Sequence, residues 1–262
     1  MVAVPFLFLS SLWACSKEDF TVAIDIGHSI KKPGAISARG IREYYFNKRI
    51  GEILLGLLVE KGFSNSFLVV SNGEDIPLES RSEIAYKRKA NILLSIHHDS
   101  VQPQYLSSWT YQGQTLLYCD KYKGFSIFCS NKNKKPTKSL LFAKLLGAEM
   151  LKEGFIPALH HAEKIQGENR DLIDQEKGIY KFDELIILKN AKIPAVLFEC
   201  GIIVNRDEEK ASSDPVYYGK ITHSILRAII DYYQTDKVID CFYLNGGGFL
   251  TLNSRHHTSK DF

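Results

Sequence analysis

The sequence lacks several features that mark well-known classes of protein. None of its five cysteines stands in a C-x-x-C pair, so a zinc ribbon and a thioredoxin-type motif are excluded. The net charge is only +3, and no block of Lys and Arg alternates with aromatic residues, so we expect no nucleic-acid partner. An apolar run at residues 2–14 is too short for a membrane-spanning helix, which needs about 20 residues.

Familiar catalytic signatures are absent as well. The chain has no H-E-x-x-H, no G-x-S-x-G and no G-x-x-x-x-G-K-[ST] motif. His161-Ala162-Glu163 has the H-x-E pattern of the zinc deaminases, but no P-C-x-x-C follows it. The sequence therefore does not favour the enzyme classes that these motifs mark.

The residues that are present predict a single α/β domain. The chain has 262 residues, of which 45% are apolar and 24% charged, an ordinary globular composition. Segments with the pattern of strands alternate with segments of helical periodicity. We expect strands at 21–26, 67–70, 92–96 and 195–198, and helices at 43–61, 77–90, 139–152, 206–209 and 218–233. This alternation predicts a central, largely parallel twisted β-sheet flanked by helices on both faces.

Three other features leave alternatives open. Residues 115–118 and 125–128 have the pattern of a hairpin, and Cys119 and Cys129 flank its turn, so a disulfide between them is one alternative. Cys200 ends an apolar segment and is expected to be a small buried residue. Residues 153–180 form a long polar segment, which is typical of a functional or mobile loop.

The two ends of the chain are expected to lie outside the domain. Residues 2–14 fit the apolar core of a secretory signal, about 7–15 residues long, although a cationic start is missing. The letters LWAC at 12–15 resemble a bacterial lipoprotein processing site, with a bulky tryptophan, and Cys15 would then attach the protein to a membrane. The alternative is a buried N-terminal strand or helix. We therefore expect a leader at 1–19, the catalytic domain at 20–233 and a weakly ordered tail at 234–262.

Polar side chains follow three of the predicted strands. His28, His97 and Glu199 stand at or just after strand ends, and Glu43 begins the first predicted helix. Each has an ordinary structural interpretation, since strand-end histidines often bond to backbone and Glu43 could face the helix dipole. Glu199 could likewise be an exposed strand end. Ligands of open α/β sheets bind at the carboxyl ends of the strands, however, so we expect all four at one edge.

Two imidazoles and one carboxylate suit a catalytic zinc that keeps one position open for water. Zinc lowers the pKa of bound water to about 7 and polarises a carbonyl. A further carboxylate is then wanted as a general base, and apolar neighbours would raise the pKa of Glu199. The residues alone thus predict metal-assisted hydrolysis of an amide or an ester.

Five motifs, in order, carry a more specific resemblance. They are IDIGHS (24–29), GIREYYFN (40–47), PLESR (77–81) with AN (90–91), SIHHDS (95–100) and PAVLFECGIIVNRDEE (194–209). Over residues 20–233 the chain resembles the zinc-dependent N-acetylmuramoyl-L-alanine amidases of bacterial cell walls. The resemblance implies that His28, Glu43 and His97 bind one zinc ion per chain and that Glu199 is the catalytic acid/base. It implies cleavage of the amide between N-acetylmuramic acid and L-alanine, in peptidoglycan or muropeptide fragments, in the periplasm or cell envelope.

The sequence also departs from the family pattern. His98 stands where the family usually has a small residue, and we expect it to be a supporting polar residue on the opposite face of the strand from His97. His160 and His161 belong to an unusual segment and are expected to form a solvated pair in a polar loop. A role beside the metal or the substrate is the alternative. A zinc peptidase acting on the stem peptide and a non-catalytic wall-binding protein on the same fold also remain open.

Export can be tested in the native host. Because residues 2–14 resemble a signal core, we expect the mature protein to be found outside the cytoplasm and to lack Met1. Cell fractionation followed by N-terminal mass analysis measures both properties. An intact Met1 on a cytosolic pool would contradict the prediction.

Overall fold

The computed structural model describes residues 16–244 of the chain. The apolar run at 2–14, Cys15 and the tail from residue 245 lie outside the described residues, so the predicted leader and lipid attachment stay predictions. Lys17–Asp19 form a short 3-10 helix, η1, before the first strand. Within residues 16–244, no helix is both long enough and apolar enough to cross a membrane.

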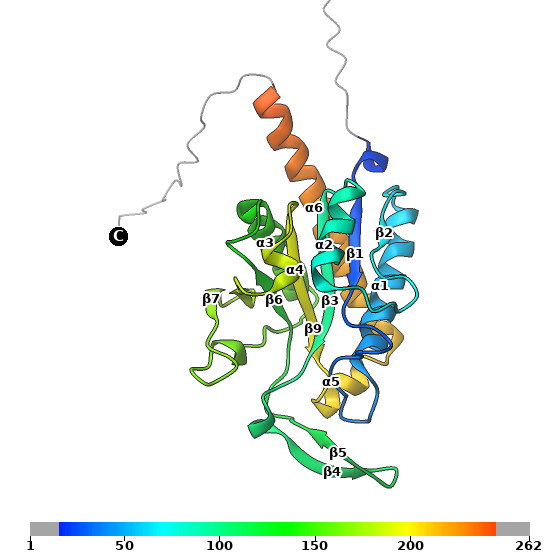
Figure 1. The fold of residues 1–262 in the computed structure, drawn as a ribbon, viewed down its shortest axis with the longest axis vertical. Helices are drawn as coiled ribbons and strands as arrows, with labels where there is room; N and C mark the ends of the chain where they lie inside the picture. Colours follow the sequence, from blue (N-terminus) through cyan, green and yellow to red (C-terminus); the bar gives the residue numbers. More distant parts are fainter. Residues whose placement is uncertain (1–15, 245–262) are drawn as a thin grey trace, which may run out of the picture.

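A seven-stranded sheet forms the centre of the molecule, as the alternating pattern predicts (Figure 1). Its order is β2-β1-β3-β9-β6-β8-β7, and β6 and β7 run antiparallel to their neighbours β9 and β8. The other four pairs are parallel. The strands are β1 Val22–Ile26, β2 Phe67–Leu68, β3 Ile92–Asp99, β6 Ser126–Cys129, β7 Asp171–Asp174, β8 Ile179–Lys181 and β9 Ala195–Ile202.

Helices cover both faces of this sheet because successive strand residues point to opposite sides. On one face, Ile24, Leu94 and Phe198 pack in a cluster with α1, α3 and α6. On the other, Leu93 and Leu197 pack with α2 and α4. The helices are α1 Glu43–Glu60, α2 Leu78–Lys87, α3 Pro136–Lys152, α4 Ile186–Lys189, α5 Arg206–Ala211 and α6 Pro215–Leu244. Two further 3-10 helices are η2 Pro103–Tyr105 and η3 His160–Ala162.

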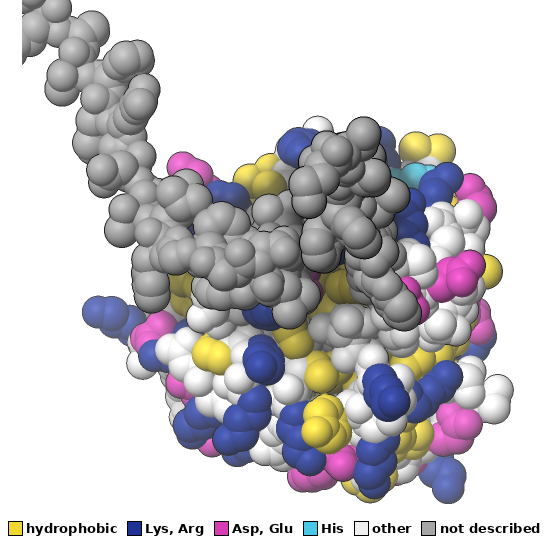
Figure 2. All heavy atoms as spheres, turned by 90° about the horizontal axis from the view of Figure 1, so that it is seen from above, with side chains coloured by type: hydrophobic (Ala, Val, Ile, Leu, Met, Phe, Trp, Pro, Cys, Tyr) yellow, Lys and Arg dark blue, Asp and Glu magenta, His cyan; other side chains and the backbone are white. Residues whose placement is uncertain are grey.

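The chain carries a weak net charge of +3. On the face seen in Figure 2, Lys and Arg side chains are interspersed with acidic, hydrophobic and polar ones. The coloured part of that face has no large patch of one sign.

The predicted hairpin at 115–128 is wrong. Strand β5, Gln114–Tyr118, pairs with β4, Ser107–Tyr111, to form a separate two-stranded arm (Figure 1). Gln112 and Gly113 link them, and both have positive φ, as a two-residue hairpin turn requires. Strand β6 instead lies in the central sheet between β9 and β8.

This arrangement of strands determines where the cysteines lie. Cys119 and Cys129 are free, so the disulfide is not formed. Cys129 packs in the cluster beneath α3, whereas Cys119 packs with Val101 and Ile202 in a separate small cluster. Cys200 is buried in the core, which confirms its prediction.

The last helix is longer than the sequence pattern indicates. α6 continues to Leu244, eleven residues beyond the helix end expected at 233. The Lys138 side chain on α3 forms an ion pair with Asp236, with 2.7 Å between nitrogen and oxygen, which holds the extension. No glycine or proline stands at residues 234–244, so no helix-breaking residue ends the helix there.

Candidate active site at the carboxyl edge of the sheet

Three side chains predicted as metal ligands converge at the carboxyl ends of β1 and β3. His28 follows β1, Glu43 is the first residue of α1, and His97 lies near the end of β3. His28 Nε2 lies 2.9 Å from Glu43 Oε2, and His97 Nδ1 lies 3.1 Å from Glu43 Oε1. One candidate ligand atom from each of the three lies within 4.8 Å of the others. The structure therefore brings together residues that are 15 and 54 positions apart in the sequence.

The Glu43 carboxylate is buried, with only 4% of the residue exposed. Its oxygens accept hydrogen bonds from the backbone N–H of Ala35 at 3.0 Å, the backbone N–H of His98 at 3.2 Å and the Asn47 side chain at 3.0 Å. Burial by itself would raise the pKa of Glu43, but hydrogen bonds from His28 and His97 outweigh it and hold the pKa well below its usual range. Glu43 is therefore a fixed anion at this edge of the sheet.

His98 supports this anion from the other side of β3. Its ring Nδ1 lies 2.8 Å from Asn47 Oδ1, so Nδ1 donates, and Asn47 in turn donates to Glu43. Burial lowers the pKa of His98 to about 4, which keeps the ring neutral at physiological pH. Its ring packs on Phe46 of α1, and His98 does not belong to the group formed by His28, Glu43 and His97. This placement agrees with the prediction of a supporting polar residue.

The backbone around His28 is held by a buried charge pair. Arg81 donates to the carbonyl oxygens of Ile26 and His28, each at 2.8 Å, and forms an ion pair with Asp25 at 3.0 Å. Ser95 of β3 donates to the other Asp25 oxygen at 2.6 Å. His28 itself adopts a positive φ of 69°. The pair thus fixes an unusual backbone conformation that turns the His28 ring toward Glu43.

Two glycines leave the room that these rings occupy. A Cβ on Gly27 would lie 2.5 Å from Nε2 and 2.6 Å from Nδ1 of His97. Gly34 has φ of +77°, and a Cβ there would lie 2.6 Å from the His28 ring. A side chain at either position would therefore push a histidine away from Glu43.

Glu199 lies beside this group, directly opposite His97 in the pairing of β3 with β9. Its Oε2 is buried and has no hydrogen-bond partner in the described part of the chain. Burial, and then the nearby charges of Asp99 and Glu43, raise the pKa of Glu199 well above its ordinary value. Glu199 is thus a carboxyl group suited to holding a proton, in contrast to Glu43.

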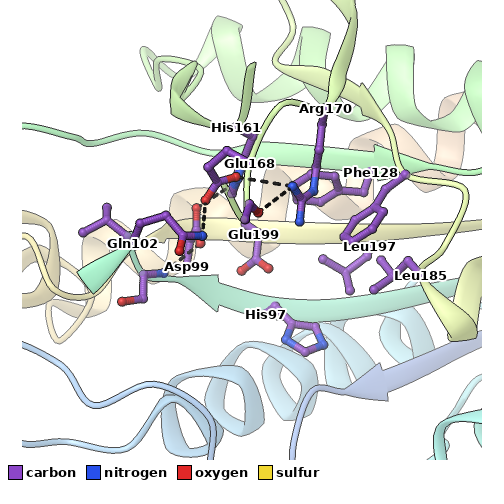
Figure 3. Close-up of a pocket in the computed structure, with 14 residues that line it drawn as sticks. His97, Asp99, Gln102, Phe128, His161, Glu168, Arg170, Leu185, Leu197 and Glu199 are labelled. Atoms are coloured by element: carbon purple, nitrogen blue, oxygen red, sulfur yellow. Dashed lines mark hydrogen bonds and ion pairs between the residues drawn. The ribbon is translucent and has the colours of Figure 1, made fainter. Parts of the chain in front are cut away.

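Cavities lie on both sides of His97. One, of about 340 Å³, contains Glu199 and is walled by Gln102, Glu168 and Arg170 (Figure 3). The other, of about 400 Å³, is lined by His28, Pro77, Ile187 and further residues of the loop before α2. His97, Leu185 and Leu197 line both. An elongated molecule could therefore extend to either side of the histidines.

His160 and His161 are not a solvated pair, so that prediction is wrong. Both are buried, with 3% and 7% of each residue exposed. His161 Nε2 lies 2.9 Å from Asp99 Oδ2, and its Nδ1 lies 2.8 Å from Glu168 Oε2 (Figure 3). Burial would lower the pKa of His161, but the two carboxylates outweigh it and raise the pKa to about 9.

Sequence reasoning placed Asp99 at this edge, at the end of the same strand as His97, but gave it no role, and it missed Glu168. One signal was present, because alternation along β3 places Asp99 on the same side as His97. No local signal pointed to Glu168, since it reaches His161 and Gln102 only after the segment at 153–180 folds back over β3.

Comparisons with known proteins point to one family. A family model described as N-acetylmuramoyl-L-alanine amidase matches residues 22–231. Haemophilus influenzae AmiB, named a probable amidase of this kind, is 29% identical over 249 residues, covering 87% of this chain and 56% of the relative. Escherichia coli AmiA is 25% identical, covering 81% of this chain and 76% of the relative. This chain thus spans about half of the Haemophilus protein, whereas it spans three quarters of AmiA.

Solved structures show the same fold. AmiC2 of Nostoc punctiforme has a TM-score of 0.62 at 20% identity, covering 82% of this chain and 97% of that one. CwlD of Clostridioides difficile, solved in complex with the GerS lipoprotein, has a TM-score of 0.62 at 22% identity, covering 83% of this chain and 100% of that one.

The role of Gly27 can be tested by adding one methyl group. In Gly27→Ala, the Cβ would overlap the His97 ring, so we expect the free energy of unfolding to fall by about 1–3 kcal/mol, as overpacking usually costs. Chemical denaturation measures it. Gly56→Ala on α1 is the matched control, because nothing lies within 4 Å of its Cβ, and it should not destabilise the protein. Equal stability of wild type and Gly27→Ala would refute the close approach.

Proposed function

Because the chain belongs to the N-acetylmuramoyl-L-alanine amidase family, we propose that it is a zinc-dependent hydrolase of the cell envelope. Its substrate is the amide between N-acetylmuramic acid and L-alanine in peptidoglycan. One observation carries the proposal: a His–Glu–His group with converging ligand atoms lies beside a buried, proton-holding glutamate. The family match supports the assignment of the bond that is cut, and the local geometry supports the assignment of a metal site.

The residues at this edge fit a zinc ion. Two imidazoles and one carboxylate are a common catalytic donor set, and three protein ligands leave a fourth position open. Glu43 is ionised in the fold, and its oxygens face both histidines, so a cation would meet a preformed anion. When bound, the metal would lower the pKa of a water molecule and polarise the scissile carbonyl.

Glu199 is the residue that moves protons in the proposed reaction. Its raised pKa suits a group that takes a proton from the attacking water and passes it to the leaving amine nitrogen. Glu43 cannot share this role, because its hydrogen bonds hold it as an anion. Buried carboxyl groups whose pKa values are pushed apart commonly divide the work in this way.

The two cavities beside His97 support a long substrate. Peptidoglycan continues on both sides of the scissile amide, with the sugar chain on one side and the stem peptide on the other. A cleft that extends in both directions from the histidines accepts such a molecule, with Arg170 and Glu168 offering charged groups in one arm.

Product analysis tests the bond that is cut. Digestion of purified peptidoglycan should release stem peptides that begin with a free L-alanine amine, and mass spectrometry identifies them. A chelator should stop the reaction, and added zinc should restore it. Shortened stem peptides still joined to muramic acid would instead indicate a peptidase, and zinc-loaded protein without products would indicate a wall-binding protein.

Glu199 and Glu43 should respond differently to the same substitution. Gln is nearly isosteric but accepts no proton, so Glu199→Gln should bind zinc and lose roughly 10²–10⁴-fold in amidase rate. Glu43→Gln removes an anionic ligand and should weaken zinc binding itself. Metal analysis and product release measure both effects. Glu60→Gln is an exposed control that should keep the wild-type rate, since Glu60 is at the far end of α1.

Two outcomes would contradict these roles. A Glu199→Gln variant that hydrolyses muramoyl-peptide at nearly the wild-type rate would exclude Glu199 as the acid/base. A Glu199→Gln variant that loses zinc together with activity would make Glu199 a ligand and leave Glu43 as a structural acid at the start of α1.

A further inference from the structure

A second cluster of side chains that could bind a metal ion lies near Glu199, apart from the His28–Glu43–His97 group. Asp99, the last residue of β3, and His160 and His161 of η3 each offer one ligand atom, and these atoms lie within 4.8 Å of one another. Asp99 Oδ2 lies 3.2 Å from His160 Nε2 and 2.9 Å from His161 Nε2. We propose that Asp99, His160 and His161 form a second divalent-metal site, distinct from the His28–Glu43–His97 group. The inference does not depend on the proposed amidase activity.

The buried ring of His160 is the observation that points to a ligand. Only 3% of the residue is exposed, and neither ring nitrogen has a hydrogen-bond partner in residues 16–244. Nε2 is close to Asp99 Oδ2 but is not aligned for a hydrogen bond with it. A buried polar group without a hydrogen-bond partner is destabilising, so such a ring needs another partner. A cation bound by Nε2 and Asp99 Oδ2 would supply it.

The surroundings of His161 are those of a metal-binding histidine. Its Nδ1 lies 2.8 Å from Glu168 Oε2, so the ring donates to a carboxylate while Nε2 faces Asp99. This order of carboxylate, imidazole and metal recurs in protein zinc sites, where the carboxylate orients the ring. Gln102 holds the other Glu168 oxygen at 2.8 Å, so the carboxylate itself is fixed.

The rings are also held in place by aromatic packing. Phe128 meets the His161 ring edge to face at 4.9 Å between ring centres, and Tyr122 lies against the His160 ring at 5.2 Å. Asp99 is oriented by the backbone N–H of Ser100, which donates to its Oδ1 at 2.7 Å. The donor atoms therefore converge in a preformed arrangement, which reduces the entropy that binding must overcome.

Two imidazoles and one carboxylate favour zinc and related divalent transition metals over calcium or magnesium. Binding would remove the proton from His161 Nε2 and release it to water, while Nδ1–H continues to donate to Glu168. The bound ion would tie η3, in the 153–180 segment, to the end of β3. It would thereby fix the wall of the cavity that contains Glu199 (Figure 3).

Metal counting tests this site directly. Untagged full-length protein, stripped with a chelator and then titrated with Zn²⁺, should bind two equivalents by plasma mass spectrometry. His160→Ala and His161→Ala should each bind one equivalent, and His97→Ala should also bind one, from the other site. The double variant His97→Ala/His160→Ala should bind none. His223→Ala is the matched control, because His223 is exposed on α6, and it should keep two equivalents.

A variant of Glu168 distinguishes two explanations of this cluster. In one, His161 binds a metal ion; in the other, it is a protonated histidine held between the carboxylates of Asp99 and Glu168. Glu168→Gln should weaken the binding of the second equivalent of Zn²⁺ by about 10–100-fold and leave the binding of the first unchanged. Saturation of the wild type at one equivalent would overturn the proposal, whether or not the histidine variants fold. Retention of two equivalents in both His160→Ala and His161→Ala would overturn it as well. Two equivalents in a protein without amidase activity would refute the proposed function alone.

Discussion

The buried Glu43 carboxylate is the interaction on which the geometry of the site depends. An unpaired carboxylate in this position would be very unfavourable, because burial removes it from water. Two histidines, the Asn47 side chain and the backbone N–H groups of Ala35 and His98 surround it instead. These groups belong to the loop after β1, to the start of α1 and to the end of β3. One anion thereby holds three parts of the chain at the same edge of the sheet.

The environments of Glu43 and Glu199 explain how two nearby carboxyl groups can differ in charge. Glu43 receives several hydrogen bonds, which stabilise its ionised form and lower its pKa. Glu199 sits in the strand β9 with its Oε2 buried and unpaired, and the charges of Asp99 and Glu43 disfavour a further anion there. Its pKa therefore rises. The same sheet edge thus offers a carboxylate with a lowered pKa and a carboxyl group with a raised pKa side by side.

The segment at 153–180 supplies a second wall for this edge. It folds back so that His161 bridges Asp99 of β3 and Glu168 of its own segment, and Arg170 lies at 4.0 Å over the Phe182 ring. His161 and Glu168, which would be solvated in an open loop, are enclosed here because each meets a partner of opposite charge or a hydrogen-bond donor. A polar composition therefore did not mean an exposed loop.

The sequence by itself predicted the four parallel strands β2, β1, β3 and β9, most of the helices around them, and the face on which each residue of these strands lies. It did not predict β4, β7, β8 or α4. Alternation along β1, β3 and β9 places Asp25, His97 and Glu199 on one face, and strand ends bring such groups to one edge, so His28, Glu43, His97 and Glu199 could be selected as candidates. Only the tertiary structure decided that β6 enters the central sheet, that Cys119 and Cys129 stay apart and that His160 and His161 are buried. Those features depend on contacts such as His161 with Asp99, 62 residues apart, and local patterns carry no information about which distant segments will meet.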